Sequence, residues 1–255
     1  MISTVLRLSV AFLVCALAAT DSAEWTEIGS SDEDSADARV IYRHVDLHDS
    51  LTGKSEIIDL AIFFTKSCRL RVIDNADGAN DLMAAMPAAN CQAGVNGGYF
   101  SPDFAPLGLR IIDGKITSRL SRGRLMSGVL ASNGSVQILR LAEFSLSKKW
   151  NAAIEGGPFL VDHGQPVRGL EKMRSARRTF AAIASVDRAA LGYCPDATLA
   201  DLAQMLSARL GDFKIQRALN LDGGSSTGYY FKGARGLYLY PEEKHVRDFV
   251  GISAR

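Results

Sequence analysis

Apolar and polar residues alternate along most of the chain beyond residue 38, and a period of two is the pattern of half-buried β-strands. The runs are short and are separated by turn-forming residues, of which Asp113-Gly114 and Asn133-Gly134 are the clearest. Asn-Gly between two apolar runs is a strong signal for a β-hairpin. The pattern predicts strands over residues 40–47, 54–64, 70–72, 91–95, 153–161, 179–186 and 218–221, with three short β runs after them.

Two segments have the longer period of an amphipathic helix instead. Residues 199–210 carry apolar side chains along one face, Thr198 with Asp201 resembles a capping box, and Gly211 follows the last turn. A shorter helix is expected over residues 81–86, ahead of a proline. Because many strands and few helices follow one another without regular alternation, the sequence predicts an α+β fold, a single domain of mixed, largely antiparallel sheets. The apolar face of the longer helix consists of Leu199, Leu202, Ala203, Leu206 and Leu210.

The first 23 residues have the pattern of a secretory signal peptide. Arg7 is the single charge ahead of the apolar run Leu8–Ala19, and small residues suitable for cleavage follow it. A run of about a dozen residues is shorter than the ~20 that a membrane-spanning helix needs. We therefore expect cleavage, no remaining membrane span and export to the periplasm or the medium, with a retained anchor as the alternative. Residues 24–37 are acidic and Ser-rich and are expected to form a flexible leader, which leaves 38–255 as the predicted domain.

The composition is that of an ordinary globular protein of 255 residues, 47% hydrophobic and 22% charged. Its 29 Lys and Arg against 28 Asp and Glu give a net charge of +1, which excludes a bulk attraction to nucleic acid or to an anionic membrane. Loss of the signal leaves Cys68, Cys91 and Cys194, an odd number without C-x-x-C spacing, which argues against a zinc site. Cys68 and Cys91 are the nearer pair in sequence and are the candidates for a disulfide in an oxidising compartment.

Three glycine-rich clusters are the candidates for a functional site: residues 96–98, 156–158 and 220–226. In the first and third, an apolar strand leads to a polar amide or carboxylate and then to paired glycines. Glycine lets the backbone adopt positive φ and expose N–H groups that can hold an oxyanion. Tight turns are the structural alternative. The clusters match neither a P-loop nor a dinucleotide-binding fingerprint, and Ser225 lacks the G-x-S-x-G spacing of an α/β-hydrolase, so a serine hydrolase is a weak alternative.

Five short motifs follow one another along the chain: N-G-G-Y-F (96–100), P-L-G-L-R-I-I-D-G-K (106–115), G-G-P-F-L-V-D-H-G (156–164), R-R-T (177–179) and L-N-L-D-G-G-S-S (219–226), with V-R-D-F-V-G-I (246–252) as a closing strand. Together they resemble the phosphodiester glycosidase family over residues 40–253. The resemblance implies a mixed α/β domain with antiparallel-rich sheets that cleaves a sugar-1-phosphodiester at the glycosidic carbon outside the cytoplasm. We expect the substrate to be an envelope or extracellular glycan. Two departures concern substrate identity: two glycines rather than three precede Ser225, and the stretch after Thr179 is longer than the family's R-T-A-I-G form.

This chemistry gives particular residues a role. Departure of a phosphodiester needs a cation on the phosphate and stabilisation of an oxocarbenium-like sugar carbon. Asp222 is the candidate nucleophile, base or transition-state stabiliser, and Asn96 would position the sugar or the phosphate. Arg178 of the R-T motif is the candidate phosphate clamp, with Arg177 as its competitor, because a guanidinium binds phosphate oxygens bidentately. The expected catalytic residues are Asp222, Arg178 and Asn96, and the expected substrate-binding residues are Gly97, Gly98, Gly157, Thr179, Gly223, Gly224 and Ser225.

The sequence leaves more than one class of function open. The first hypothesis is an exported hydrolase that cleaves a sugar-1-phosphodiester, and the alternative is a non-catalytic module of the cell envelope that binds a glycan or phosphoglycan. A third is an envelope-assembly factor with a vestigial pocket. A divalent cation such as calcium is compatible with Asp222, although no motif requires one. The aromatic residues beside the glycine clusters either stack on a sugar or pack in the core, and we expect core packing for at least half of them. They are Tyr99, Phe100, Tyr229 and Tyr230.

Overall fold

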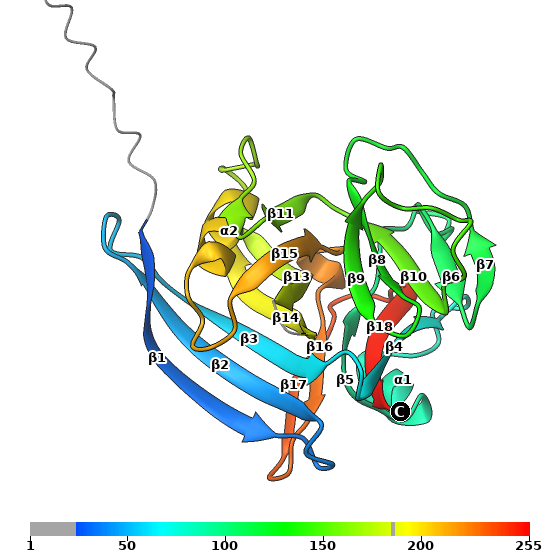
Figure 1. Ribbon diagram of the computed structural model, residues 1–255, viewed down its shortest axis with the longest axis horizontal. Helices are drawn as coiled ribbons and strands as arrows, with labels where there is room; N and C mark the ends of the chain where they lie inside the picture. Colours follow the sequence, from blue (N-terminus) through cyan, green and yellow to red (C-terminus); the bar gives the residue numbers. More distant parts are fainter. Residues whose placement is uncertain (1–23, 185–186) are drawn as a thin grey trace, which may run out of the picture.

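The computed structural model describes residues 24–184 and 187–255, which form three β-sheets with two α-helices beside them (Figure 1). Within each sheet the neighbouring strands pair in antiparallel fashion, as expected for an α+β domain with few helices. The eight-stranded sheet has the order β1-β2-β3-β14-β13-β15-β11-β12. Its strands are β1 (Trp25–Asp34), β2 (Val40–Asp49), β3 (Ser55–Phe64), β11 (Phe159–Asp162), β12 (Gln165–Pro166), β13 (Ala176–Ala184), β14 (Arg188–Ala197) and β15 (Ile215–Asn220).

The other two sheets have five strands each. One has the order β7-β6-β10-β8-β9, and the other has the order β17-β16-β5-β18-β4. Both turn predictions are confirmed, since Asp113-Gly114 connects β6 to β7 and Asn133-Gly134 connects β8 to β9. The strands are β6 (Arg110–Ile112), β7 (Lys115–Ser118), β8 (Gly128–Ser132), β9 (Val136–Arg140), β10 (Ala152–Gly156), β4 (Cys68–Asp74), β5 (Cys91–Asn96), β16 (Tyr229–Lys232), β17 (Leu237–Tyr240) and β18 (Asp248–Ala254).

The apolar stretch 153–161, expected as one strand, is divided between two sheets. Its first half is β10 and pairs with β6 and β8, whereas its second half is β11 and pairs with β15. Gly157-Pro158 lies between the halves, and proline cannot donate to a strand ladder. The G-G-P cluster is therefore the place where the chain passes from one sheet to the next.

The two helices are found close to their expected places. α2 (Leu199–Ser207) is capped by Thr198, whose hydroxyl accepts a 3.0 Å hydrogen bond from the Asp201 amide. α1 (Leu82–Ala88) is capped by Asp81 and includes Pro87, so the expectation that this proline stops the helix was wrong by two residues. A proline in the last turn removes a single intrahelical hydrogen bond, and the helix ends directly after it.

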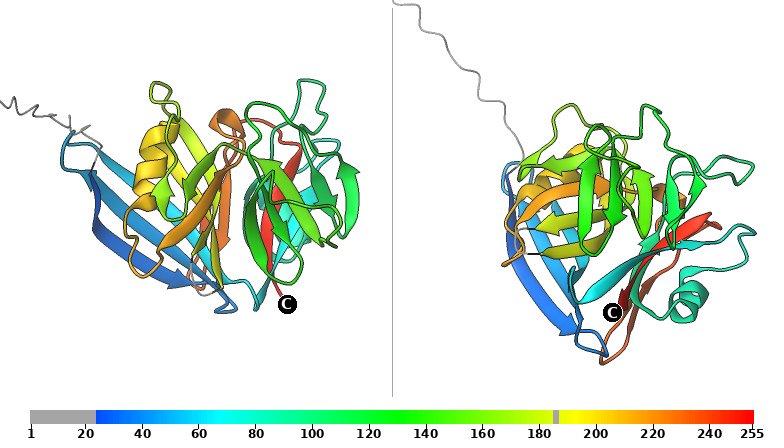
Figure 2. Two further views of the ribbon diagram at one scale, coloured as in Figure 1. Left: turned by 45° about the horizontal axis from the view of Figure 1, so that its top comes forward. Right: turned by 45° about the vertical axis from the view of Figure 1, so that its right-hand side comes forward.

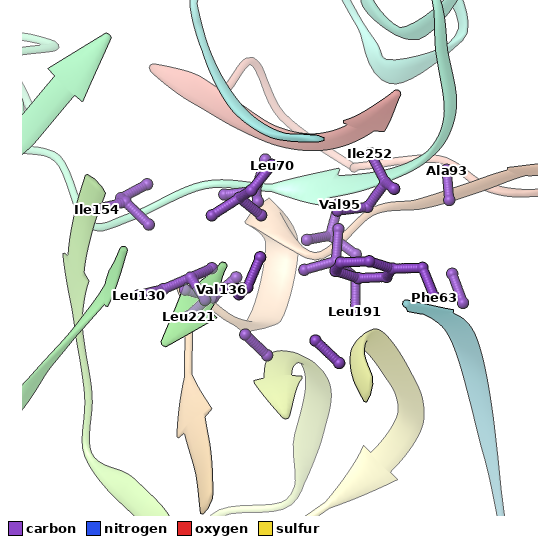
Figure 3. Packing of buried hydrophobic residues seen from close by; sticks show 14 of the residues in the cluster. Phe63, Leu70, Ala93, Val95, Leu130, Val136, Ile154, Leu191, Leu221 and Ile252 are labelled. Atoms are coloured by element: carbon purple, nitrogen blue, oxygen red, sulfur yellow. The ribbon is translucent and has the colours of Figure 1, made fainter. Parts of the chain in front are cut away.

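The three sheets share one apolar core. Figure 3 shows side chains from the eight-stranded sheet and from both five-stranded sheets meeting in it. A second apolar cluster fills the space between α2 and the eight-stranded sheet. The labelled members of the shared core are Phe63, Leu70, Ala93, Val95, Leu130, Val136, Ile154, Leu191, Leu221 and Ile252.

Most of the expected flexible leader is an edge strand. β1 pairs with β2 over nearly its whole length, with a bulge between Glu27 and Gly29. Trp25 is buried, and the buried Glu33 accepts hydrogen bonds from the Tyr238 hydroxyl and from the Arg235 guanidinium. Acidic composition suggested solvation, but partners some two hundred residues away bind this segment to the sheet. The expectation of a flexible leader is corrected accordingly.

The disulfide suggested between Cys68 and Cys91 is also corrected. All three described cysteines are free and buried. Cys68 pairs with Ala254 and Cys91 with Ser253, so strand β18 lies between them. Two strand spacings amount to about 10 Å, whereas a disulfide needs Cα atoms within about 7 Å. The predicted signal peptide, 1–23, lies outside the described residues, and among the described helices none is long and apolar enough to cross a membrane.

Candidate active site

The three glycine clusters come together where β5, β10 and β15 end. The Gly157 amide donates to the Asn220 carbonyl at 2.8 Å, and the Asp222 amide donates to the Gly97 carbonyl at 3.2 Å. The Asn220 side-chain amide donates to the Gly157 carbonyl at 3.1 Å. In the left view of Figure 2, the short helix η1 (Gly224–Ser226) lies at the rim of the molecule, above the sheets. The clusters are thus one site and not three separate turns.

Asn96 and Thr179 lie beneath the Asp222 loop and are fully buried. The Asn96 amide nitrogen donates to the Asp222 carbonyl at 2.7 Å, and its oxygen accepts from the Thr179 hydroxyl at 2.7 Å and from the Gly228 amide at 3.2 Å. Both ends of the amide are therefore bound to protein. The geometry gives Asn96 and Thr179 the task of positioning the loop, whereas the sequence suggested direct contact with substrate.

Asp222 presents a carboxylate that has few partners. Its Oδ1 accepts a 3.0 Å hydrogen bond from the Gly223 amide, and Gly224 has φ of 64°, which turns the chain into η1. Burial raises the pKa of Asp222, and the neighbouring Ser226 hydroxyl and Lys244 ammonium lower it by a smaller amount. A carboxylate held by one backbone amide keeps lone pairs free for a substrate or a water molecule.

The side chain of Arg178, and not that of its competitor Arg177, lies beside the Asp222 loop at Gly223. Arg178 donates from Nε to the Ala197 carbonyl at 3.0 Å and from Nη2 to the Arg174 carbonyl at 2.8 Å. Its Nη1 points at Gly223, where an added Cβ would be 3.5 Å away. Burial lowers the pKa of Arg178 from its usual value, but a guanidinium remains charged at any physiological pH. The site thus has a cation with two hydrogen bonds to the protein and one nitrogen directed at the Asp222 loop.

Arg177 occupies a different position. It forms an ion pair with Glu243 at 2.9 Å and donates to the carbonyls of Thr227 and Pro241. The pairing of β13 with β14 is irregular between Ala176 and Arg178, and the two neighbouring arginines have different partners. The sequence could not separate them, because the register of β13 against its neighbours was unknown.

Tyr99 is a site residue that the sequence treated only as an aromatic neighbour. Its hydroxyl donates to the Gly157 carbonyl at 2.6 Å and accepts from the Asn220 side-chain amide at 3.0 Å. Burial, followed by the negative charge of Asp222, raises the pKa of Tyr99 to about 12. The sequence did not single out Asn220, although it lies in the third cluster. The buried Oδ1 of Asn220 has no hydrogen-bond partner among the described residues.

A buried ion pair supports the first cluster from below. The Asp248 carboxylate accepts from the Arg110 Nε at 2.6 Å and from the Gly98 amide at 2.8 Å, and both side chains are 2% exposed. Arg110 also donates to the Tyr99 carbonyl at 3.1 Å. A Cβ at Gly97 would collide with the Asp248 carboxylate, and one at Gly98 would collide with the Arg110 guanidinium. The two glycines are needed for close packing against this pair. Neither charge was assigned a role from the sequence.

The remaining candidates lie around this centre. Gly224 is open to solvent on the side where a Cβ would be, and Ser225 is exposed at the tip of η1. Glu155, next to Gly156 at the end of β10, is fully buried and accepts on Oε2 from the Leu109 and Ser121 amides, while its Oε1 has no hydrogen-bond partner among the described residues. Tyr229 and Tyr230 are core residues.

The site has no evident cluster of metal ligands. Within residues 24–184 and 187–255, no group of three or more His, Cys, Asp or Glu side chains is arranged to hold a metal ion. The Asn96 oxygen is taken by Thr179 and Gly228, which leaves the Asp222 carboxylate and the Asn220 Oδ1 as side-chain oxygens of the site with free lone pairs. A guanidinium and backbone N–H groups can bind an anion, and a nearby carboxylate can stabilise positive charge that develops on a carbon atom of the substrate.

Two of three comparisons with known proteins find relatives of this chain. A model of the phosphodiester glycosidase family matches residues 89–253. The catalytic domain of zebrafish N-acetylglucosamine-1-phosphodiester alpha-N-acetylglucosaminidase, auto-inhibited by its pro-peptide, is similar at 17% identity with a TM-score of 0.58. That match covers 93% of this chain and 85% of the zebrafish one. Comparison with curated proteins gives no match.

Two further solved structures have the same fold. A hypothetical protein from Synechocystis is similar at 14% identity with a TM-score of 0.58, and the match covers 85% of this chain and 62% of that one. The present chain therefore spans less than two thirds of that protein's length. A Burkholderia pseudomallei K96243 protein, provisionally described as exported, is similar at 13% identity with a TM-score of 0.56, covering 79% of this chain and 75% of the other. At these identities the likeness concerns the fold alone.

Proposed function

Since the chain belongs to the phosphodiester glycosidase family, we propose that it is a hydrolase that cleaves the glycosidic bond of a sugar-1-phosphodiester. The observation that carries this proposal is that Asp222, a carboxylate held by one backbone amide, lies on a loop whose next residue, Gly223, is beside the free nitrogen of Arg178. Asp248 is engaged on both oxygens, by Arg110 and by Gly98. Glu155 is held on Oε2 by two backbone amides, and its buried Oε1 has no hydrogen-bond partner among the described residues.

The proposed reaction uses these groups in defined ways. Arg178 Nη1 binds a phosphate oxygen and stabilises the negative charge that grows as the bond between the anomeric carbon and that phosphate's bridging oxygen breaks. Asp222 stabilises the positive charge on the anomeric carbon, either through space or through a transient ester bond that the attacking water then breaks, which releases the carboxylate. Water supplies the new hydroxyl to that carbon, and its second proton goes to solvent, since a phosphate leaves without a strong general acid. Asn96 and Thr179 hold the Asp222 loop in place as positioning residues.

The glycine backbone completes the proposed substrate site. Close approach of the loops and the substrate is possible because five positions are glycine: Gly97, Gly98, Gly157, Gly223 and Gly224. Ser225 adds a hydroxyl at the edge of the site. We further propose that the substrate is an envelope or extracellular glycan and that the protein is exported. The apolar run within residues 1–23 supports export, as does the similar Burkholderia protein provisionally described as exported.

Turnover is the decisive measurement. The purified protein is incubated with a small panel of sugar-1-phosphodiesters, beside Asp222→Asn and the control Asp113→Asn, which changes an exposed carboxylate on the β6–β7 turn. We expect free sugar from the wild type and the control, and a loss of at least about a hundredfold in Asp222→Asn, the scale of losing one electrostatic stabiliser. A chelator arm tests whether a divalent cation takes part. Saturable binding without turnover would support the glycan-binding module instead.

A further inference from the structure

Positive charge is concentrated in two loops on either side of the proposed site. The net charge of the chain is only +1, yet no Asp or Glu occurs from residue 114 to residue 142, and Glu171 is the only one from 163 to 186. The loop between β7 and β8, residues 119–127, and the loop between β12 and β13, residues 167–175, contain most of the cations of these stretches. We call these two loops the basic rim. Its cations are Arg119, Arg122, Arg124, Arg168, Lys172 and Arg174.

Both loops are anchored to elements of the site. In the first loop, the Ser127 amide donates to the Gly156 carbonyl at 3.0 Å, and a Cβ at Gly157 would collide with the Leu125 carbonyl. In the second, the Arg174 carbonyl accepts the 2.8 Å hydrogen bond from Nη2 of Arg178. Figure 2 (left) shows η1 between the yellow-green segment that precedes β13 and the green sheet that contains β8. The two loops of the rim therefore lie on either side of η1, at positions that the fold determines.

The cations of the rim are not used inside the protein. All six side chains belong to exposed residues, and within the described chain none of them forms an ion pair. The one acid between them, Glu171, turns its carboxylate to the amides of Met173 and Arg174 in its own loop. Elsewhere in the molecule, arginines such as Arg43, Arg188 and Arg217 are paired with acids. Unpaired like charges held near one another repel, and an anionic ligand removes that repulsion.

We propose that the basic rim binds the charges that neighbour the scissile bond in a polyanionic glycan, so that the substrate is a polymer with repeated phosphodiesters and not an isolated sugar-1-phosphodiester. This inference rests on the proposed function and deepens it. Arg178 binds the phosphate of the bond that breaks, and the loops on either side bind phosphates before and after it along the chain. Guanidinium groups suit this task because they form bidentate hydrogen bonds to phosphate.

An anionic membrane surface is the other partner that a basic rim could bind. Leu125 and Met173 are exposed within the rim, and a membrane-binding loop uses such apolar side chains together with its cations. Two features favour the polyanion. The cations outnumber the exposed apolar side chains, and the loops surround a site whose proposed substrate is itself a phosphodiester.

The test compares a polymer with a small substrate. The full-length mature protein is assayed on an oligomer of N-acetylglucosamine-1-phosphate repeats and on the methyl diester of N-acetylglucosamine 1-phosphate. The rim variants are Arg122→Gln with Arg124→Gln, and Arg168→Gln with Lys172→Gln. The matched control is Lys148→Gln with Lys149→Gln, which removes two exposed cations at the far end of β10 from Gly156.

We expect each rim variant to lower the ratio of kcat/KM for the oligomer to kcat/KM for the methyl diester about five- to tenfold, from two exposed charge pairs of ~0.5 kcal/mol or more each. The slope of log KM against log salt for the oligomer should fall by about two, one for each lost phosphate contact. Inorganic polyphosphate should inhibit the wild type far better than inorganic phosphate at equal phosphorus concentration. The control should change none of these values.

The outcomes separate this inference from the proposed function. If both substrates are turned over and the ratio of their kcat/KM values is the same in the rim variants, the control and the wild type, the polyanion proposal is overturned. The proposed glycosidase activity would still stand. The rim would be assigned to a membrane if two results came together. The protein would bind vesicles of anionic lipid and lose this binding in Leu125→Ser with Met173→Ser, and the rim variants would leave kcat/KM for the oligomer unchanged. No turnover of either substrate would overturn the proposed function, and polyphosphate binding that rim variants weaken would then still support a polyanion site.

Discussion

Replacement of Asp248 by asparagine should cost stability far more than one lost negative charge at a surface would. Asp248 and Arg110 are each 2% exposed, and the carboxylate accepts on both oxygens, from the Gly98 amide and from the Arg110 Nε. An asparagine has only one acceptor oxygen. Whichever way the amide turns, its NH2 group faces one of these two donors. The variant therefore loses a charge-assisted hydrogen bond and leaves a buried guanidinium without a counter-charge.

The magnitude follows from these two losses. Breaking a buried ion pair by removing one partner costs about 3–5 kcal/mol, most of it from the uncompensated buried charge. Arg110 keeps its hydrogen bonds to the carbonyls of Tyr99 and Leu109, which favours the lower half of that range. A loss of about 3 kcal/mol corresponds to a fall in Tm of roughly 6–12 °C for a domain of this size.

The matched control lies on the neighbouring strand. Asp74 is directly opposite Asp248 in the pairing of β4 with β18, and it forms an ion pair with Arg247 at the surface, where 49% of the Asp74 side chain is exposed. Asp74→Asn should cost less than about 1 kcal/mol, as exposed ion pairs do.

Equilibrium unfolding in urea, followed by circular dichroism, measures both variants against the wild type. A cost for Asp248→Asn no greater than that for Asp74→Asn would refute the reasoning. The double variant Asp248→Leu with Arg110→Met should recover part of the loss, because no charge is then left unpaired.

Four more outcomes follow from the structure. Burial raises the pKa of Asp222 above 3.8, so the ionised carboxylate destabilises the fold. Asp222→Asn should therefore have a higher Tm than the wild type at neutral pH, and this difference should vanish in acid. Equal Tm values at pH 7 would contradict this. For the same reason, kcat/KM of the wild type should fall as the pH drops through a value above 3.8, and a limb at or below 3.8 would speak against a buried catalytic carboxylate. Gly97→Ala should lower both stability and activity, since its methyl group meets the Asp248 carboxylate, whereas Gly236→Ala, where nothing lies within 4 Å, should behave as the wild type. A thiol reagent should react with Cys68, Cys91 and Cys194 only after unfolding, because burial raises the pKa of all three thiols. A Tm that falls when a reductant is added would instead show that a disulfide is present.

Local sequence determined most of the elements and the identity of the candidate clusters. Alternation, Asn133-Gly134 and the Thr198 cap each depend on interactions between residues a few positions apart, so these predictions were confirmed. Local composition was misleading for the edge strand β1. Its acidic residues are typical of a leader, and only the distant Arg235 and Tyr238 give Glu33 a buried partner.

The tertiary structure decided what each functional residue does. The sequence placed Arg177 and Arg178 side by side, and the register of β13 assigned one to Glu243 and the other to the Asp222 loop. Arg110 and Asp248 are 138 positions apart, and no local pattern predicts that they form the buried pair beneath Gly97 and Gly98. Chain connectivity and periodicity act over a few residues, whereas burial and hydrogen bonding in a site depend on which distant strands become neighbours. For this protein the sequence therefore determined the family and the motifs, and the folded structure determined which side chains remain free to act.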